Sequence, residues 1–354
     1  MIDLNKLQPV KISTDANSYS SFVYGPAKIG KTTFVEQMAP GKVLHVMTEK
    51  RFKTLSGAFV VYVKNFTEFM QVMAQLRQPK FKKEFQIVSV DTVENLHRML
   101  EKYVAQLFDE TQVGERNDLF GKDWTTMKSL WFDNLKKIEK EGYVPNFVSH
   151  SVQEIVHIPK SEIVSSGKEV PTEYTEVKNK KDGKTYLEFN RYAPDMKDKE
   201  FAPINNMVDN ILFLNNTIDD QGETLRVIHL RPSLQWIAGS TFKHIKATIP
   251  LSVDAYQKAV HEAISKESDN KDDYTDKRQA DADISEEEVP FKDLQKRLQN
   301  VALKFKKADK IPELLEISES FVGKGNRVTD LKESQKEVLE AVVEALENKV
   351  KTFK

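Results

Sequence analysis

The sequence predicts an α/β fold with a mostly parallel sheet, followed by an acidic linker and a small all-helical C-terminal module. Short β-rich runs alternate with helical patterns over the first two-thirds of the chain. A Gly-x-x-x-x-Gly-Lys-Thr pattern at 25–32 lies between one such run and a helical pattern. After residue 264 the chain has an acidic stretch, which is followed by apolar residues at helical spacing. A chain of 354 residues also favours one large domain plus a smaller one.

The strands of the sheet are expected where β-branched and aromatic residues cluster: 21–24, 43–47, 59–63, 86–90, 146–149 and 210–214. A further pair of runs, 225–230 and 234–237, flanks Arg231-Pro232-Ser233. This pair predicts a closing hairpin at the edge of the sheet, where a proline disturbs the ladder least.

Three domains follow from these patterns. Residues 1–264 form the large domain, with 151–205 as an inserted hairpin and loop region. Residues 265–288 have almost no large apolar side chain and many acids, which is typical of a disordered linker. Residues 289–354 show apolar residues at helical spacing and predict a small helical domain.

Composition limits the function classes. The chain has no cysteine, which excludes disulfides and thiolate metal sites. We see no apolar run long enough for a bilayer and no secretion signal, so we expect no membrane partner and a cytoplasmic location. The formal net charge is only -1, so a nucleic-acid contact would have to come from local basic surface.

The glycine-rich segment carries the clearest chemistry. Glycines at both ends of the pattern let backbone N–H groups turn toward phosphate oxygens, and the N-terminus of the following helix attracts the anion. Lys31 would reach the β- and γ-phosphates of ATP, and the Thr32 hydroxyl would bind Mg²⁺. The nucleotide-binding residues are therefore expected to be Gly25, Pro26, Ala27, Lys28, Ile29, Gly30, Lys31, Thr32 and Thr33.

Carboxylates at strand ends supply the other expected groups. Asp91 follows a buried strand and fits the second Mg²⁺ ligand, although an Asp at this place could also cap the next helix. Thr92 occupies the next position, where many ATPases have a catalytic Glu, so the base must come from elsewhere. Glu49, at the end of the run 43–47, is the candidate base, with Glu94 as the next one. His150 ends another strand and could sense the γ-phosphate.

Three segments, GPAKIGKTT, VSVDTVENL and NFVSHSVQEI, together resemble the core of the RecA family, and more closely its phage-encoded recombinase branch. The resemblance covers about 20–252, and DLFGKDWTTMKSLWFDNL is similar to the phage branch as well. It implies a RecA-like ATPase domain in which Glu49 activates water and His150 senses the γ-phosphate. The family often places basic residues late in the core to complete a neighbouring subunit's site. Here Thr241 stands where an arginine would be unsurprising, so Lys243 or Lys246 would act in trans.

The resemblance also implies that the loop after the sensor strand contacts single-stranded DNA. Residues 172–189 predict a hairpin turning at Asp182-Gly183 with nearby aromatic side chains. Four lysines gather near its tip: Lys178, Lys180, Lys181 and Lys184. The whole interval 151–205 contains slightly more acids than bases, so a solvated hairpin or a subunit contact is an equal alternative.

The phosphate loop predicts an ATP- and Mg²⁺-dependent ATPase, and the resemblance implies that it acts on single-stranded DNA in phage recombination or annealing, in the bacterial host's cytoplasm. We expect a homo-oligomer, ring or filament, with a single-strand DNA-binding protein as a further partner. A replicative helicase or helicase loader, a P-loop kinase of a small molecule and an ATP-gated DNA clamp are the alternatives. The basic helix near 292–307 could bind DNA or a partner, or simply be a solvated surface.

Overall fold

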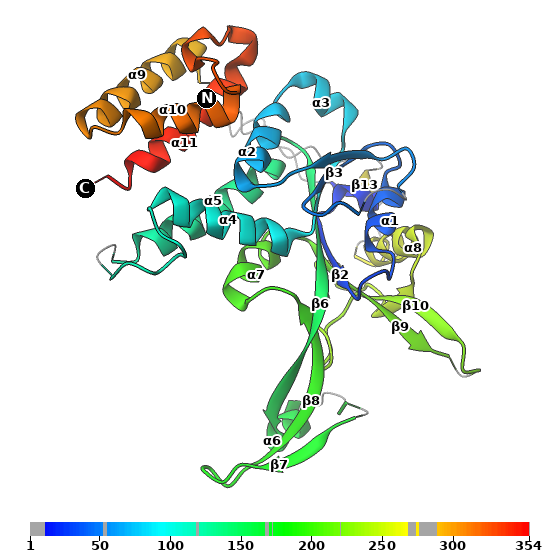
Figure 1. The fold of residues 1–354 in the computed structure, drawn as a ribbon. Coiled ribbons are helices and arrows are strands. Elements are labelled where there is room, and N and C mark those ends of the chain that lie inside the picture. Colours follow the sequence, from blue (N-terminus) through cyan, green and yellow to red (C-terminus); the bar gives the residue numbers. More distant parts are fainter. Residues whose placement is uncertain are drawn as a thin grey trace, which may run out of the picture. The chain divides into compact units, whose positions relative to one another are not determined.

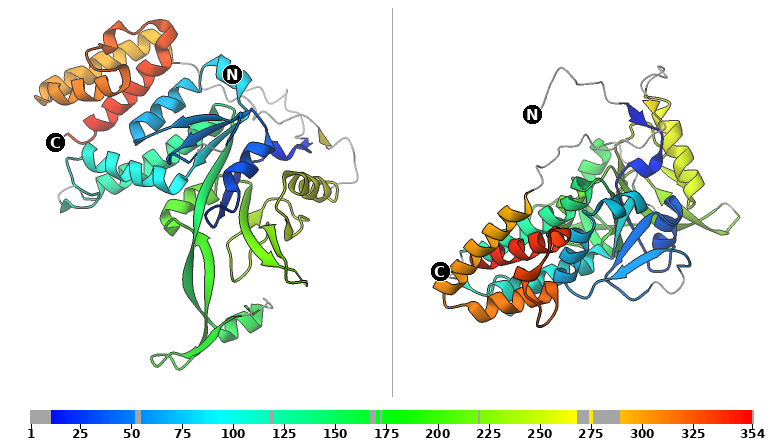
Figure 2. Two further views of the ribbon diagram at one scale, coloured as in Figure 1. Left: turned by 45° about the vertical axis from the view of Figure 1, so that its right-hand side comes forward. Right: turned by 90° about the horizontal axis from the view of Figure 1, so that it is seen from above.

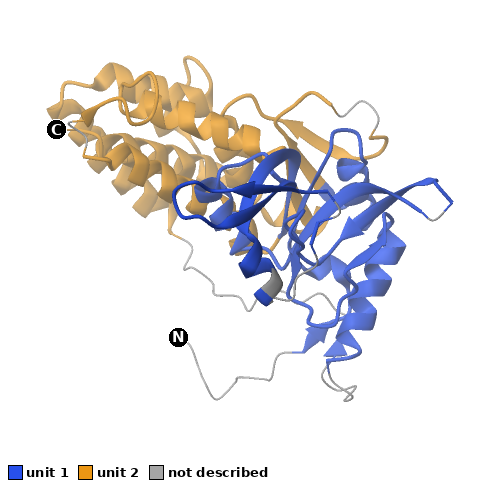
Figure 3. Cartoon of the chain, turned by 90° about the horizontal axis from the view of Figure 1, so that it is seen from below, with its two compact units in different colours: residues 1–43, 144–280 blue, residues 44–143, 281–354 orange. Residues whose placement is uncertain are grey.

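The computed structural model describes residues 11–51, 55–117, 120–166, 170–171, 173–219, 221–267, 274–275 and 289–353. It divides the chain into two compact units (Figure 3). Unit 1 comprises Met1–Val43 and Val144–Ala280, and unit 2 comprises Leu44–Tyr143 and Asp281–Lys354. Most of the predicted acidic linker falls outside the described residues.

Unit 1 contains strands in the order β12-β10-β9-β2-β6. These are β2 (Ser21–Gly25), β6 (Val144–Pro159), β9 (Asn210–Ile218), β10 (Thr224–His229) and β12 (Thr248–Pro250). The central strand β2 is parallel to both β6 and β9, while β10 runs antiparallel to β9 and β12. Every residue of β2 is buried, as expected for a strand with neighbours on both sides. Unit 1 also holds β1 (Ile12–Ser13), β11 (Gly239–Ser240), β13 (Tyr274–Thr275), α1 (Lys31–Met38), α7 (Asp198–Asn205) and α8 (Val253–Ile264).

A long arm extends from the sheet of unit 1 (Figure 1). It consists of the second half of β6, the antiparallel β8 (Thr185–Pro194), the outer strand β7 (Thr175–Lys178) and α6 (Lys160–Ser166). Buried Ile163, Leu187 and Phe189 give it a small core of its own. The expected strand 146–149 therefore continues well beyond its predicted end.

The expected hairpin between 225–230 and 234–237 is wrong. The partners of β10 are β9 and β12, and residues 234–237 form no strand. Instead, the indole N–H of Trp236 donates to the carbonyl of Arg231 (3.0 Å), which closes a compact turn after β10. The backbone of this segment meets β8 instead of β10: the N–H of Tyr192 donates to the carbonyl of Gln235 (2.7 Å).

Unit 2 contains β3 (Val43–Met47), β4 (Phe59–Tyr62) and β5 (Ile87–Asp91), in the order β5-β3-β4. Strands β3 and β4 are parallel. Its helices are α2 (Phe66–Gln75), α3 (Pro79–Glu84), α4 (Val93–Leu107), α5 (Lys122–Lys140), α9 (Phe291–Lys307), α10 (Ile311–Val322) and α11 (Lys336–Val350). Figure 2 shows the last three as a bundle, and they share a core that includes Leu294, Phe305 and Leu346.

The C-terminal bundle packs on the other helices of unit 2. The ammonium of Lys349, on α11, is buried and donates to the carbonyl of Leu107 (2.7 Å), at the end of α4. Lys137 on α5 pairs with Glu344 (2.7 Å), and Arg77 pairs with Glu340. These contacts join the bundle to α4, α5 and the segment after α2 by buried and half-buried polar groups.

The two units confirm the predicted fold class: a mixed, mostly parallel sheet with helices, followed by a helical C-terminal region. Among the described residues, none of the helices combines the length and the apolar character needed to cross a bilayer.

Candidate nucleotide site

The glycine-rich segment of unit 1 forms a loop between β2 and α1 (Figure 1). Gly30 precedes α1 with a φ of 111°, in the region that favours glycine. At the other end of the loop, a Cβ added to Gly25 would lie 2.3 Å from the carbonyl oxygen of Leu214 on β9. Both glycines are therefore required by the backbone itself, one by its φ angle and one by a neighbouring strand.

Lys31 is the first residue of α1, and its side chain turns back over the loop. Its ammonium is buried and donates to the carbonyls of Gly25 (2.8 Å) and Pro26 (2.9 Å). The first N–H groups of a helix lack intrahelical acceptors, so this end of α1 offers positive potential together with the ammonium. The Lys31 ammonium and the loop backbone N–H groups are hydrogen-bond donors suited to phosphate oxygens, and the hydroxyl oxygen of Thr32 is of the kind that binds Mg²⁺. The residues present therefore fit a nucleotide.

His150 lies beside this loop. Strands β2 and β6 are parallel, and Gly25 and His150 are directly paired in their register. The His150 carbonyl accepts the N–H of Asp195 (2.9 Å), which holds the backbone where β6 leaves the sheet. Unit 1 thus brings the predicted sensor residue to the start of the phosphate loop.

Unit 2 carries the two predicted carboxylates at the ends of its strands. Asp91 is buried at the end of β5, and Glu49 follows β3. The strand ends are tied together: the N–H of Thr48 donates to the Asp91 carbonyl (2.8 Å), and the Thr48 hydroxyl accepts the N–H of Thr92 (2.9 Å). This tie fixes the backbone next to both carboxylates.

The Glu49 carboxylate has two partners in unit 2. Its Oε1 accepts a hydrogen bond from the side-chain amide of Asn95 (2.8 Å), and its Oε2 pairs with Arg51 (2.9 Å). Glu94, the second candidate base, is buried in the first turn of α4. The sequence did not predict that Asn95 orients Glu49, because Asn95 belongs to no recognisable motif.

The lysines expected to act in trans lie in unit 1 after β11. Lys246 pairs with Glu262 of α8 (2.8 Å). Lys243 is exposed, and its carbonyl accepts a hydrogen bond from the guanidinium of Arg231 (2.6 Å). Arg231 also donates to the carbonyl of Phe242 (2.5 Å), so it shapes the segment that carries both lysines.

The four lysines of the hairpin lie around the tip of the arm. The N–H of Asn179 donates a hydrogen bond to the carbonyl of Lys184 (2.9 Å), which closes the turn. Gly183 in this turn has a φ of 70°. Asp182 accepts the hydroxyl of Tyr186 (2.8 Å) and the backbone N–H of Lys184 (3.0 Å). In the described part of the chain, the side chains of Lys178, Lys180 and Lys181 form no ion pair, so their charges face solvent.

An aromatic stack beside the loop strand was not predicted. Tyr24 precedes Gly25, and its ring stacks on Phe213 of β9 (4.8 Å between centroids). Phe213 stacks on His229, and His229 on Trp236 (4.0 Å). The Tyr24 hydroxyl also donates to the carbonyl of Ile237 (2.6 Å). Burial lowers the pKa of His229 from 6.5 to about 4, so this ring stays neutral at physiological pH.

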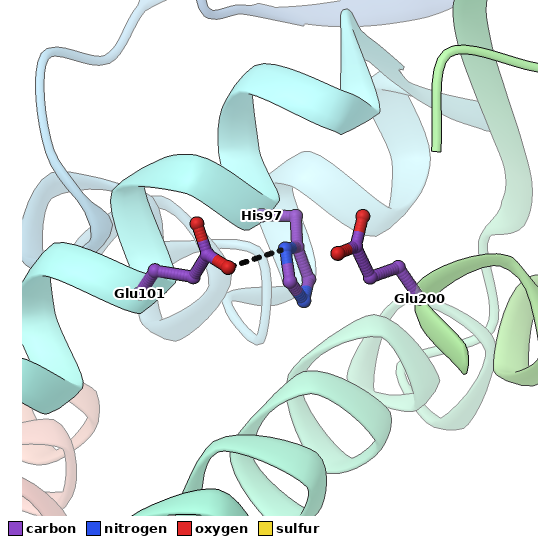
Figure 4. Close-up of side chains that lie close together, drawn as sticks. All are labelled: His97, Glu101 and Glu200. Carbon is purple, nitrogen blue, oxygen red and sulfur yellow. Dashed lines mark ion pairs between the residues drawn. The ribbon is translucent and has the colours of Figure 1, made fainter. Parts of the chain in front are cut away.

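A further pair of titratable side chains lies on α4. Figure 4 shows Glu101 turned toward buried His97, with 4.0 Å between Oε1 and Nδ1. The His97 ring packs edge-on against Trp131 (4.9 Å). Glu200, also drawn, accepts the N–H of Lys197 (3.2 Å) at the start of α7 in unit 1. We assign these groups to packing and helix capping.

Two comparisons identify known proteins to which this chain is similar. The family model described as AAA domain matches residues 17–242, which include the phosphate loop, both candidate carboxylates and the arm. The SPbeta prophage-derived uncharacterized protein YorG of Bacillus subtilis strain 168 is 22% identical over 335 residues, covering 92% of each chain. The similarity thus extends beyond the matched domain into the C-terminal region.

Proposed function

The chain belongs to the AAA domain family, and we propose that it is a Mg²⁺-dependent ATPase that acts on single-stranded DNA in phage recombination or annealing. The observation that carries the ATPase proposal is the loop of unit 1, in which Lys31, two constrained glycines and a helix N-terminus provide a phosphate cradle. The prophage origin of YorG supports a phage setting.

In this proposal the loop backbone and Lys31 would bind the β- and γ-phosphates, and Thr32 and Asp91 would hold Mg²⁺. The metal would neutralise charge on the transferred phosphoryl group. Glu49, oriented by Asn95, takes the proton of the attacking water, and His150 senses the γ-phosphate from its place beside Gly25.

The arm supports the DNA part of the proposal. Its tip carries three lysines whose charges face solvent, with Tyr186 at the same turn. Lysines beside aromatic rings suit a single strand because cations contact phosphates and bases stack on rings. We also propose a homo-oligomer, ring or filament, in which Lys243 or Lys246 acts on a neighbouring site, and a single-strand DNA-binding protein as a partner.

The test is ATP hydrolysis by the full chain with and without a single-stranded oligonucleotide, for the wild type and Lys31→Ala. We expect DNA to stimulate the wild type, and the variant to lose ATP binding because the phosphates lose their cation. Lys42→Ala is a matched control, since Lys42 is exposed in the same unit. Tight ATP binding by Lys31→Ala would refute the ATPase assignment.

The same preparation separates the alternatives. Unwinding of forked DNA would identify a helicase. A rate of ATP consumption that does not change with DNA but rises with a small phosphate acceptor would identify a kinase. Nucleotide-dependent DNA binding without turnover would identify an ATP-gated clamp.

A further inference from the structure

Helix α5 of unit 2 exposes aromatic rings and lysines in alternation. Trp124, Lys128, Phe132 and Lys136 follow one another at every fourth position, and we call them the α5 ridge. Side chains four residues apart on a helix are neighbours. Trp124 is 50% exposed and Phe132 is 43% exposed, which is unusual for rings of this size beside a well-packed helix face.

The ring of Trp124 is held in place. A Cβ added to Gly114 would lie only 2.6 Å from the indole nitrogen of Trp124, so the ring edge lies against the Gly114 backbone. The N–H of Gly114 in turn donates to Asp123 (2.5 Å), which is buried at the start of α5. Trp124 is therefore a positioned platform with an open face, and little conformational entropy is lost when a ligand stacks on it.

The charges on the ridge are positive. The Lys136 ammonium lies 5.6 Å from the centre of the Phe132 ring, and Lys128 is exposed without an ion pair among the described residues. Helix α5 also carries two acids near these residues: Asp133, which accepts a hydrogen bond from Ser129 (3.0 Å), and half-buried Glu139 in the last turn. Rings alternating with cations match a polyanion that also has flat apolar groups.

We propose that the α5 ridge is a binding surface for single-stranded DNA, with bases stacked on Trp124 and Phe132 and phosphates beside Lys128 and Lys136. This inference rests on the proposed function and assigns it a second contact, separate from the arm. The two rings are about 12 Å apart along the helix, a distance that a few nucleotides of a single strand can span. Duplex DNA is not a ligand of this surface because its bases are not free to stack.

The experiment measures binding of a fluorescent oligothymidylate to the full chain by anisotropy at several salt concentrations. Trp124→Ala and Phe132→Ala are each expected to weaken binding about 5- to 100-fold. The double variant Lys128→Gln with Lys136→Gln should reduce the slope of log affinity against log salt by up to about 1.4. Lys102→Gln, at an exposed lysine on α4, is the control and should change neither quantity.

Intrinsic fluorescence gives an independent measurement. The chain has three tryptophans. Of these, Trp124 is exposed, Trp131 is buried and Trp236 is half-buried. The single strand should quench the wild type, and a duplex should not. Trp124→Phe should retain most of the affinity, because a ring remains for stacking, but lose the quenching.

Wild-type affinity in a variant lacking both rings would overturn the proposal while leaving DNA binding by the arm intact. A change in sedimentation of the ridge variants, with DNA affinity retained, would identify the ridge as a contact between copies and overturn it as well. If the wild type itself does not bind the single strand, the proposed function fails together with this inference. Circular dichroism and ATP binding show whether each variant is folded.

Discussion

Gly25 and His150 are directly paired in the parallel register of β2 and β6. Gly25 begins the phosphate loop, and β6 continues past His150 into the arm without interruption. His150 therefore lies on one continuous strand between the candidate nucleotide site and the candidate DNA contact. Strand β6 pairs with β2 up to His150 and with β8 from Ser151 onward, so the backbone is held on either side of this residue.

Replacing His150 by Ala should lower DNA-stimulated hydrolysis about 10²-fold, the usual effect of removing one group that contacts the reacting phosphate. ATP affinity should be unchanged, since Lys31 and the loop backbone remain. His157→Ala is the matched control, because His157 is exposed farther along the same strand. Wild-type turnover by His150→Ala would remove this residue from the mechanism.

Glu49→Gln should lower hydrolysis about 10²- to 10⁴-fold while ATP still binds, because the amide cannot accept the proton of water. The substitution keeps the shape of the side chain beside Asn95. Single-turnover measurements separate chemistry from product release. If turnover stays near normal, Glu94→Gln becomes the decisive variant.

Much of the site was predictable from the sequence, because a phosphate loop needs glycines, lysine and threonine in a fixed order. The length of β6, which continues past His150 to Pro159, was not predictable. Its outer half alternates buried and exposed residues only weakly, so no clear period marked it as a strand. The turn at Trp236 escaped prediction for another reason. The indole of Trp236 bonds to the Arg231 carbonyl, and the neighbouring backbone bonds to Tyr192 of β8; strand propensity reports neither contact.

The place of the C-terminal bundle was also not predictable, because its attachment to unit 2 depends on individual polar contacts. Lys349→Ala should destabilise the chain by about 2–3 kcal/mol, since the carbonyl of Leu107 and the carboxylate of Glu313 lose a buried ammonium (2.7 and 3.2 Å). Chemical denaturation measures this loss. Lys351→Ala, at an exposed lysine two residues later, should have little effect. Equal stability of the two variants would show that the contact is not structural.

His229 predicts a dependence of stability on pH. Its pKa falls from 6.5 to about 4 on folding, so the unfolded chain binds this proton more tightly between these values. Stability should therefore decrease as pH falls from about 6.5 to about 4, by up to about 2 kcal/mol after allowance for solvent. His229→Phe keeps a ring against Trp236 and should remove this part of the pH dependence. An unchanged pH profile would contradict the assignment.

The arm provides the last test, because its lysines carry the proposed DNA contact. Replacing Lys178, Lys180, Lys181 and Lys184 together by Gln should weaken single-strand binding and flatten its salt dependence by up to about 0.7 per lost phosphate contact. ATP affinity should not change, and Lys258→Gln with Lys266→Gln, at exposed lysines of unit 1, is the control.

Glutamine substitutions at basic residues of α9, such as Lys292, Lys304 and Lys307, test the competing site. They are preferable to truncation, because removal of the bundle would expose the apolar surface of unit 2 that it covers, including Met70 and Met73. A larger loss in the α9 variants than in the arm variants would move the main DNA contact to the bundle. If neither set alters binding, and DNA leaves hydrolysis unstimulated, the DNA proposal fails, whereas the ATPase assignment stands on Lys31 and its loop.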